Sequence, residues 1–546
     1  MGSNRRRWIG LLLIALGVAL IVVDTTIVNV IVPSIVRTIG IDSVQTQWVQ
    51  ESYAITFAAL LLVAGRVADI IGARTVFICG AIVFGAASVL AGLAPSASLL
   101  IGARFAQGVG GGLILPTSLS LLNAMFDGPA RAKAFAVWGS TIGASSALGP
   151  LLGGWLTEHL SWRWAFGVNV PLVAIVVVGA VFFVDRSVPQ RGRLDVLGAV
   201  LSVVGLGLLA FALIEGRRYG WLLIQTPAHV LGADWDAGPS PALVAALWSA
   251  VALTLFVLRQ TALARSGRTD TALVDVRLFS VASFRGGNVA TLIIGVGEFG
   301  IIAVLPLWLQ FALGYTPIAA GAALVPLAVG SFVASGISFT TPATPLTFVR
   351  IGLALEAIGL AVLGLVAAVD SPWWHLWSAL FVYGVGVGFA TAQVTNVVLD
   401  EIPESSSGQA SGIQSAFRQL GSALGIAVLT TTFFTVLGAS LHDRLVAAGT
   451  TADQADTISQ QVTDTAGAAI AGFAARPDTA PIAQAGAEAL THATTFASYL
   501  AAGFILIGLA ATLLIPRRSR ADQPPTTTLA AASSRLLDNG SRQRGP

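Results

Sequence analysis

Long apolar runs recur along the whole chain, with short polar stretches between them. A helix needs about 20 apolar residues to cross the hydrocarbon core of a bilayer, and fourteen runs reach that length. The pattern predicts an all-α integral membrane protein with 14 transmembrane helices. The runs lie near residues 8–36, 47–65, 75–94, 98–122, 134–157, 165–184, 194–214, 241–259, 287–312, 318–340, 347–369, 376–399, 411–437 and 492–515.

The composition is also typical of a protein buried in lipid. Hydrophobic residues make up 55% of the chain and charged residues 10%, whereas about a quarter of an ordinary soluble domain is charged. Such a chain cannot cover itself with polar surface, so the lipid bilayer is its expected partner. The net charge of +3 comes from Arg residues that cluster between apolar runs, and this distribution does not indicate a nucleic-acid interface.

The positive residues are divided unevenly between the two ends of the helices. If the N-terminus is cytoplasmic, the cytoplasmic segments hold 22 of the 30 Lys and Arg and the outer loops hold six, while Arg104 and Arg418 lie within helices. The positive-inside rule therefore predicts a multi-pass protein of the cell (plasma or inner) membrane with both termini cytoplasmic. The first run, which follows three Arg residues, is interpreted as a retained helix, with a cleaved signal peptide as the alternative.

Three acidic residues fall well inside predicted spans, at Asp24, Glu298 and Glu356. A carboxylate there costs about 2.5–3.5 kcal/mol on insertion scales, so such residues usually face a wet cavity or a partner. We expect them to bind a proton or a cationic substrate, with Asp24 as the principal acid; the alternative is a neutral or paired acid that serves helix packing. The glycines at 295–300 permit either bending of the helix or close packing beside Glu298. Glu51, near the outer end of the second predicted helix, is expected to be a solvated acid of the outer vestibule.

A loop after the second run carries Gly65, Asp69, Gly72 and Arg74 in the order GRVADIIGAR. Asp69 can cap a helix N-terminus or pair with Arg74 in one conformation and lose that partner in another. This loop, residues 65–74, resembles the signature loop of the major facilitator superfamily and is called the latch loop below. Two positions that are usually basic in the family hold Ile and Ala, which leaves fewer charges for the latch.

Two further motifs resemble the same superfamily. Residues 104–112, RFAQGVGGG, resemble its intramembrane arginine motif, which implies a role for Arg104 in proton transfer. The fifth span resembles the antiporter motif of exporters, and glycine and proline are tolerated in such a span only where neighbouring helices satisfy the backbone. The motif residues are Gly143, Gly149, Pro150, Gly153 and Gly154.

Within the superfamily, the most specific resemblance is to the 14-helix drug:proton antiporter branch. It rests on residues 23–33, 47–50, 161–171, 309–317 and 411–421, and it covers residues 8 to about 515. It implies two six-helix bundles that bind substrate between them at mid-bilayer and rock to expose it to each side in turn. The implied divisions are 8–184, two inserted helices within 185–286, and 287–515. Residues 340–345 contain no aspartate, so a second latch is not expected.

Two polar stretches stand outside this pattern. Residues 438–490 form a long outer loop in the prediction, interpreted as a tolerated insertion, with substrate gating as the alternative. Residues 516–546 have the composition of a disordered cytoplasmic tail.

The function expected from these features is proton-coupled efflux of amphipathic, cationic or lipophilic small molecules. A dedicated exporter of one endogenous lipid, siderophore or secondary metabolite is the alternative, and a uniporter or channel is disfavoured by the antiporter motif. An enzyme is not expected, because the histidines are scattered and no metal, nucleophile or phosphate-binding motif is present. The single cysteine, Cys79, excludes an intrachain disulfide. We expect no cofactor, and the proton gradient as energy source.

Overall fold

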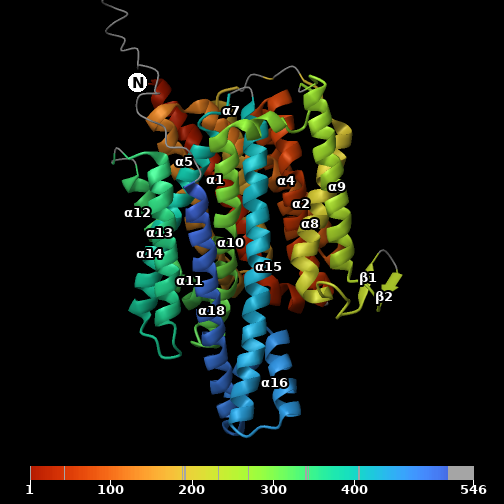
Figure 1. Cartoon of the computed structure of the whole chain (residues 1–546), viewed down its shortest axis with the longest axis vertical. Coiled ribbons are helices and arrows are strands. Elements are labelled where there is room, and N and C mark those ends of the chain that lie inside the picture. Colours follow the sequence, from red (N-terminus) through yellow and green to blue (C-terminus); the bar gives the residue numbers. More distant parts are fainter. Residues whose placement is uncertain are drawn as a thin grey trace, which may run out of the picture.

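The protein is a bundle of long antiparallel helices (Figure 1). The computed structural model describes residues 2–41, 43–186, 189, 192–230, 233–268, 270–338, 341, 343–403 and 406–513, and the predicted tail 516–546 lies outside them. The elements are α1 (Gly2–Ile39), α2 (Ser43–Ile71), α3 (Ala73–Gly92), α4 (Ala97–Met125), α5 (Gly128–His159), α6 (Arg163–Gly167), α7 (Asn169–Phe183), α8 (Val196–Tyr219), β1 (Ala228–Val230), β2 (Ala233–Trp235), α9 (Pro241–Arg265), η1 (Val276–Ser280), α10 (Ala282–Phe311), α11 (Pro317–Ala323), α12 (Val325–Ile337), α13 (Pro345–Val366), α14 (Trp373–Leu399), α15 (Ser407–Ala447), α16 (Ala452–Asp464), α17 (Ala469–Ala474), η3 (Pro477–Thr479) and α18 (Ala480–Thr512).

Thirteen of the described helical segments are long and apolar enough to cross a membrane. The remaining predicted span, 134–157, lies in α5, whose 32 residues are rich in Gly, Ala and Ser and therefore less apolar. α5 packs against α1, α12 and α14, so it stands inside the bundle as the fourteenth membrane helix. Two of the predicted spans are each built from two helices, α6 with α7 and α11 with α12.

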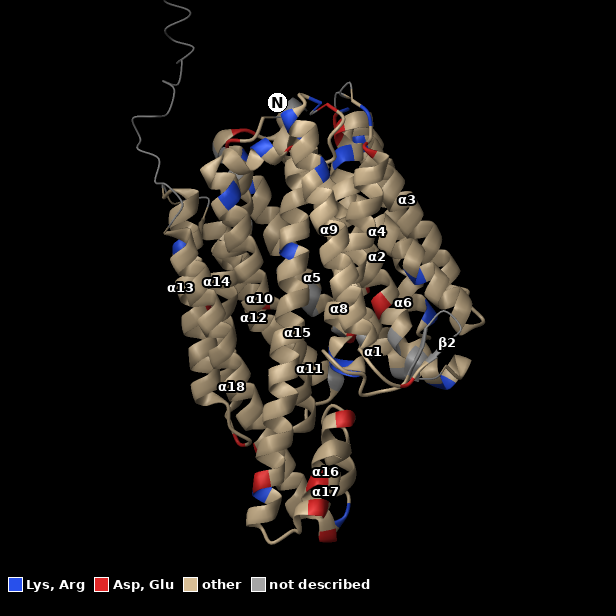
Figure 2. Cartoon of the chain, turned by 45° about the vertical axis from the view of Figure 1, so that its right-hand side comes forward, with Lys and Arg blue, Asp and Glu red and all other residues tan. Residues whose placement is uncertain are grey.

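The two ends of the bundle differ. We call the end where the N-terminus lies the N-side and the opposite end the far side (Figure 1). Lys and Arg gather at the N-side, whereas acidic residues mark the far end of the molecule around α16 (Figure 2). This is the arrangement that the unequal distribution of positive residues predicts.

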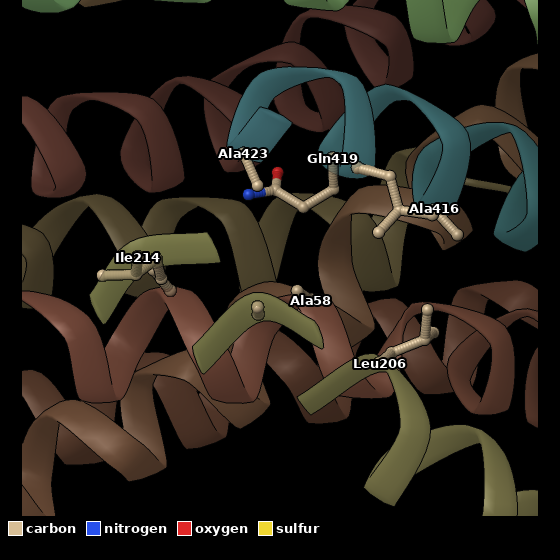
Figure 3. A pocket seen from close by; sticks show the side chains of 9 residues that line it. Ala58, Leu206, Ile214, Ala416, Gln419 and Ala423 are labelled. Carbon is tan, nitrogen blue, oxygen red and sulfur yellow. The ribbon is translucent and has the colours of Figure 1, made fainter. Parts of the chain in front are cut away.

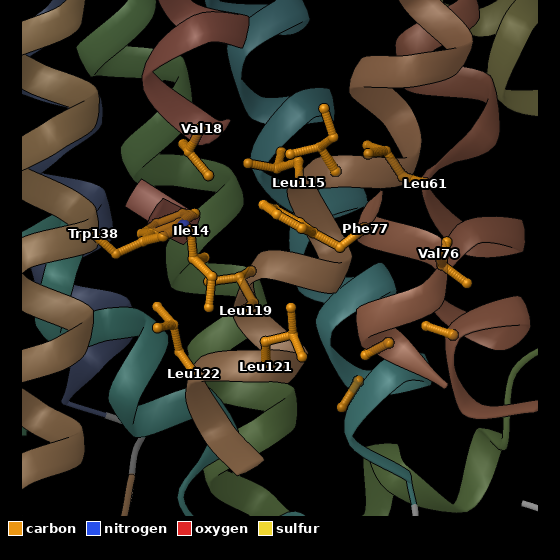
Figure 4. Close-up of a cluster of buried hydrophobic side chains, with 14 of the residues drawn as sticks. Ile14, Val18, Leu61, Val76, Phe77, Leu115, Leu119, Leu121, Leu122 and Trp138 are labelled. Carbon is orange, nitrogen blue, oxygen red and sulfur yellow. The ribbon is translucent and has the colours of Figure 1, made fainter. Parts of the chain in front are cut away.

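Close packing holds the helices of each half together. Figure 4 shows the core of the first half, where Trp138 of α5 lies with Ile14 and Val18 of α1 and Leu119 and Leu122 of α4, all fully or almost fully buried. A second core in the other half includes the large buried side chains of Trp308, Tyr383 and Phe433. Lipid tails are as apolar as these side chains, so association of the helices depends on their fit to one another more than on exclusion of water.

The inserted helices α8 and α9 form a hairpin, and α8 packs against both α2 and α15. Asp195 caps the start of α8 by accepting hydrogen bonds from Gly198 N (3.0 Å), Arg259 Nε (2.8 Å) and Gln260 Nε2 (2.9 Å). Burial alone would raise the pKa of Asp195, but the hydrogen bonds from Arg259, Gly198 and Gln260 outweigh it and hold the pKa below its ordinary value. Asp195 therefore joins the N-side ends of α8 and α9.

Residues 438–490, called the far-side extension, project beyond the bundle (Figure 1). The sequence pattern predicted a loop here, but the structure forms helices: the ends of α15 and α18 with α16 and α17 between them. Their apolar side chains are buried together and continue the core of the second half; they include Leu441, Leu445, Ala455, Val462 and Ile470. An ion pair between Arg444 and Glu488 joins α15 to α18.

The far side also holds a short hairpin that the sequence did not indicate. Strands β1 and β2 pair antiparallel, with Ala228 opposite Trp235 and Val230 opposite Ala233. The hairpin lies in the connection between α8 and α9, away from the core of the bundle (Figure 1).

Candidate functional site

The first buried ion pair joins Asp24 of α1 to Arg104 of α4. Both side chains are shielded, with relative exposures of 0% and 1%, and Arg104 Nη1 lies 2.5 Å from Asp24 Oδ2. These are two of the residues that the sequence singled out, and the fold brings them into contact across 80 positions of the chain. Inside a membrane such a pair is far less costly than either charge alone.

Amide side chains complete the shell around Asp24. Gln107 Nε2 and Asn169 Nδ2 each donate to Asp24 Oδ1 at 3.0 Å, and both also donate to Ser88 Oγ, at 2.9 and 3.3 Å. Asn169 is the first residue of α7 and directly follows Val168, which separates α6 from α7. Side chains of α1, α4 and α7 therefore meet at one carboxylate, and α3 joins them through Ser88.

Arg104 also connects to α2. Its Nε donates to the backbone oxygen of Val49 at 2.9 Å, and its guanidinium lies 4.4 Å from the centroid of the Tyr53 ring. Such a contact stabilises a desolvated cation. The Asp24–Arg104 network is thus balanced in charge and joined by several hydrogen bonds, so a rearrangement of α1 against α4 has to break more than one bond at once.

The second half has a looser cluster, formed by Glu298 of α10, Glu356 of α13 and Arg418 of α15. Arg418 Nη2 lies 3.8 Å from Glu298 Oε1, an ion pair without a hydrogen bond. Arg418 also lies 5.4 Å from the centroid of the Phe299 ring, and Tyr383 donates to the backbone oxygen of Glu298 at 3.2 Å. This cluster carries two acids for one arginine, whereas the Asp24–Arg104 network carries one for one.

Glu356 is the least satisfied of these acids. Its relative exposure is 0%, and neither carboxylate oxygen has a hydrogen-bond partner among the described residues. It interacts electrostatically with Glu298 and Arg418. The sequence singles out both Glu298 and Glu356, and the structure places them in one cluster of the second half. The sequence does not indicate that Arg418 pairs with Glu298 alone.

The glycines around Glu298 serve helix packing in this structure. α10 continues unbroken from Ala282 to Phe311, so the run 295–300 contains no bend. A Cβ atom on Gly295 would lie 3.1 Å from the backbone of α15 at Gly421, and one on Gly300 would lie 2.6 Å from Gly425 O. Of the two interpretations of this run, close contact between α10 and α15 is the one observed.

The latch loop joins the two halves at the N-side. Asp69 Oδ1 accepts from Gly408 N at 2.7 Å and Oδ2 from Gln409 N at 2.9 Å, so this carboxylate caps the N-terminus of α15. Gly65 lies against the backbone of Gly408 and Gly412, where a side chain would collide. Of the two partners predicted for Asp69, a helix N-terminus is the one observed.

The rest of the latch loop turns toward the first half. Gly72 has a φ of +96°, which a residue with a side chain rarely adopts, and it makes the turn into α3. Arg74 donates to the backbone oxygen of Val181 at the end of α7. The latch therefore depends on Asp69 and on Gly65 and Gly72 rather than on an Asp69–Arg74 pair.

Further contacts join the two halves at the N-side. Arg131 at the start of α5 pairs with Asp400 at the end of α14 and donates to Asn123 Oδ1 at 3.2 Å. Asn123 in turn donates to Ser407 Oγ at 3.2 Å. Together with Asp69, these contacts join the two halves at the N-side in this conformation.

The antiporter motif forms a tight contact between α5 and α1. A Cβ on Gly153 would lie 2.8 Å from Ile27 Cγ1, and one on Gly149 would collide with the Thr26 hydroxyl. Gly154 instead faces the second half, where an added Cβ would lie 3.3 Å from Ile318 of α11. Gly143 and Pro150 lie within α5, and their surroundings fall outside the described part of the chain.

A small apolar pocket lies where α2, α8 and α15 meet (Figure 3). Alanines line it from all three helices, among them Ala58 and Ala416, and Leu206 and Ile214 come from α8. Gln419 supplies the polar group. The inserted helix α8 thus borders the seam between the halves.

Several residues of the site were not assigned a role from sequence. Gln107 and Asn169 lie in the quoted motifs, and the signal that could have identified them is the cost of an amide inside an apolar helix. Ser88, Tyr53 and Tyr383 carry no such signal.

Glu51 was expected to be solvated, but it is buried in α2 at 7% exposure. Within the described residues, no group of three or more His, Cys, Asp and Glu has the spacing of a metal site.

Comparison with known proteins agrees with this architecture. The family model of the Major Facilitator Superfamily matches residues 14–426. The multidrug efflux pump LfrA of Mycolicibacterium smegmatis is 32% identical over 84% of this chain and 86% of its own, and the puromycin resistance protein pur8 of Streptomyces alboniger is 33% identical over 83% and 87%.

A solved structure with 13% identity, the human organic anion transporter MFSD10, shares the fold with a TM-score of 0.59 over 93% of this chain and 99% of that one. The fold, the family match and the motifs of α1, α2, α4 and α5 agree with one another. The chain belongs to the major facilitator superfamily of membrane transporters, in its 14-helix drug:proton antiporter branch.

Proposed function

We propose that the protein exports amphipathic, cationic or lipophilic small molecules in exchange for protons. The observation that carries the proposal is the presence of a buried acid–arginine cluster in each half, at Asp24–Arg104 and at Glu298–Arg418. Charges inside a membrane protein are costly to keep and mark ion or substrate pathways. Acids on both sides of the seam between the halves suit a cycle in which protons and substrate bind in alternation.

The proposed cycle is alternating access between the two halves, 8–184 and 287–515, with residues 185–286 as the inserted pair. In the conformation described here the Asp69 latch and the Arg131–Asp400 pair hold the N-side shut. Release of these contacts lets the halves rock and open that side. The antiporter motif, with Gly149 and Gly153 against α1, provides the close helix contact about which the first half moves.

Two observations support this substrate class: the side chains at the seam between the halves, and the name of a relative. A seam lined by alanines and leucines offers loose apolar contact, and the acids favour a cation. LfrA, a relative, is named as a multidrug efflux pump. One proton moving inward across 100 mV releases about 2.3 kcal/mol, so one or two protons suffice for substantial accumulation outside.

A second candidate is export of one dedicated product, such as a lipid, siderophore or secondary metabolite. The relative pur8 has similar identity and is named for resistance to a single compound, puromycin. Competition assays separate the two candidates: a broad exporter is inhibited by chemically unrelated cations, and a dedicated exporter is not. In both cases the protein acts without chemical conversion of its cargo.

We propose that the N-side is cytoplasmic and that the protein resides in the cell membrane. With this orientation, the segments expected to be cytoplasmic hold 22 of the 30 Lys and Arg. Single cysteines placed in residues 259–285 and in the far-side extension, in a background lacking Cys79, test this orientation with an impermeant thiol reagent on intact cells. Labelling of the far-side extension alone is expected, and labelling of 259–285 from outside overturns it.

Transport itself is tested with purified protein in liposomes that contain a pH-sensitive dye. A panel of cationic, neutral and lipid-like compounds is added under an imposed proton gradient. We expect a true substrate to cause proton movement in the opposite direction. If compounds cross equally well after the gradient is collapsed, and none moves protons, facilitated diffusion replaces antiport as the mechanism.

A further inference from the structure

The surroundings of Glu356 indicate which acid of the second half holds a proton. This side chain is fully buried, and both of its oxygens lack a hydrogen bond within the described structure. The backbone of α14 comes close to it at Gly386, where an added Cβ would lie 2.7 Å from Glu356 Cγ. An ionised carboxylate in such a place loses its hydration and gains almost nothing in return. A neutral carboxyl group does not carry that penalty.

The side chains that interact with Glu356 offer little compensating charge. α10 contributes Glu298, α15 contributes Arg418, and α14 contributes the Tyr383 hydroxyl, which donates to the backbone oxygen of Glu298. α18 places Tyr499 against Gly364, two turns away from Glu356. The group that can balance a negative charge is therefore Arg418, and it lies 3.8 Å from Glu298.

Counting charges gives one surplus acid in this cluster. Two carboxylates share one guanidinium, and two like charges that share a site do not both remain ionised. One bound proton restores neutrality. The Asp24–Arg104 network differs, because one carboxylate faces one guanidinium and also accepts hydrogen bonds from Gln107 and Asn169. That network is neutral without a proton.

We propose that Glu356 carries the transported proton in this conformation, that Glu298 is the ionised partner of Arg418, and that the Asp24–Arg104 pair stays ionised through the cycle. The proposal rests on the proposed function and specifies where its proton sits. When the N-side opens and water reaches Glu356, the O–H bond breaks and the proton leaves to water on that side. A cationic substrate then neutralises the carboxylate until it is exchanged for a new proton.

The first test is spectroscopic and requires no substrate. Infrared spectra of the full-length protein in lipid at neutral pH report the C=O stretch of protonated carboxyl groups. We expect Glu356→Gln to remove the intensity of one such group, whereas Asp24→Asn and the exposed control Glu158→Gln leave it unchanged. Full retention of the band in Glu356→Gln overturns the proposal, as does its loss in Asp24→Asn.

Stability provides a second, independent readout. Glutamine matches a neutral glutamic acid in shape, so Glu356→Gln is expected to melt at the temperature of the parent protein. Arg418→Gln removes the guanidinium that keeps Glu298 ionised, so its spectrum should gain the intensity of a further carboxyl group. An unchanged carboxyl band in Arg418→Gln overturns the charge count even if another variant fails to fold.

Transport in liposomes then separates this proposal from the proposed function. If the parent protein exchanges ethidium for protons, Glu356→Gln should lose ethidium-driven proton movement, whereas the exposed control Glu158→Gln should keep it. Continued proton movement in Glu356→Gln overturns the assignment of the proton to Glu356. If the parent protein moves no protons for any compound, antiport itself fails, while the infrared result still decides where a proton is bound.

Discussion

Arg104 Nη1 lies 2.5 Å from Asp24 Oδ2, and both side chains are buried. Among the described residues neither charge forms another ion pair, so the two residues depend on each other. Removing either leaves a buried group unpaired, but the consequences differ. A carboxyl group can take up a proton and become neutral, whereas a guanidinium cannot lose one in a protein.

Asp24→Asn is therefore expected to be the more damaging change. It leaves the Arg104 charge buried, and breaking a buried pair in this way costs about 3–5 kcal/mol. We expect a lower melting temperature of the purified protein and loss of dye export from cells. Asp24→Asn combined with Arg104→Gln should regain part of the stability and none of the export. Normal export of a cationic dye by Asp24→Asn, at normal abundance, would contradict the conclusion that transport depends on the Asp24–Arg104 pair.

Arg104→Ala is expected to yield an inserted and folded protein that couples poorly. Asp24 can become neutral in this variant, and Gln107 and Asn169 still donate to it. The melting temperature should thus lie above that of Asp24→Asn, while proton-driven export is lost because α4 no longer holds α1 and α2 together. Export that is normal across a range of pH would exclude Arg104 from coupling.

Asp69→Ala should favour opening of the N-side. The variant loses two charge-assisted hydrogen bonds to the start of α15, each contributing about 1.5–3 kcal/mol, and the conformational equilibrium should shift by about tenfold or more. Distances between spin labels on the N-side ends of α5 and α14 measure the shift. Asp127→Ala is the matched control, because Asp127 is exposed on the same side and makes no capping hydrogen bond. Equal distance distributions in the two variants would rule out the latch.

Gly153→Leu is expected to inhibit transport by separating α5 from α1. Even a Cβ at this position reaches 2.8 Å from Ile27, and overpacking of this kind costs about 1–3 kcal/mol. Gly102→Leu on α4 introduces the same side chain where no atom lies within 4 Å, so transport should survive there. Initial export rates at matched abundance compare the two, and equal rates would show that the α1–α5 contact is not needed.

Asp195→Asn tests the tie between α8 and α9. The pKa of Asp195 is lowered in the folded protein, so its ionised form stabilises the fold above the ordinary carboxylate value of about 4, and this contribution disappears as the pH falls through the lowered value. The parent protein should lose melting temperature below about pH 4, whereas Asp195→Asn should be less stable at neutral pH and change less on acidification. Asp185→Asn, at an exposed pair with Arg6, serves as control. Parallel pH curves for all three proteins would contradict the prediction.

The membrane helices could be located from sequence because each leaves a run of apolar residues of the right length. The far-side extension could not, since α16 is a polar helix that buries only Ala455, Ser459 and Val462 on one side. A search for membrane-length runs reads such a helix as a loop. Its fold depends on apolar contacts with α15, to which it is joined by only a short turn.

The functional site, too, could be predicted from the sequence only in part. Asp24, Glu298 and Glu356 stand out individually because charges are rare within spans, yet their partners lie far along the chain. That Arg104 is bound to Asp24, and Arg418 to Glu298 instead of Glu356, depends on how four or five helices cross. Asp69 shows the limit most clearly, because the motif indicates a helix N-terminus as partner but not that it belongs to α15.

α15 is a single helix of 41 residues, which corresponds to a rod of about 60 Å. Its N-side end is held by Asp69, Arg418 lies along its length, and its last turns belong to the far-side extension. A tilt of about 10° around the middle of such a rod displaces each end by ~5 Å in opposite directions. Release of the latch at the N-side should therefore swing the far-side extension at the other end of the rod. An antibody that clamps the far-side extension against the first half would then arrest the pump from the far side without entering the path of its cargo.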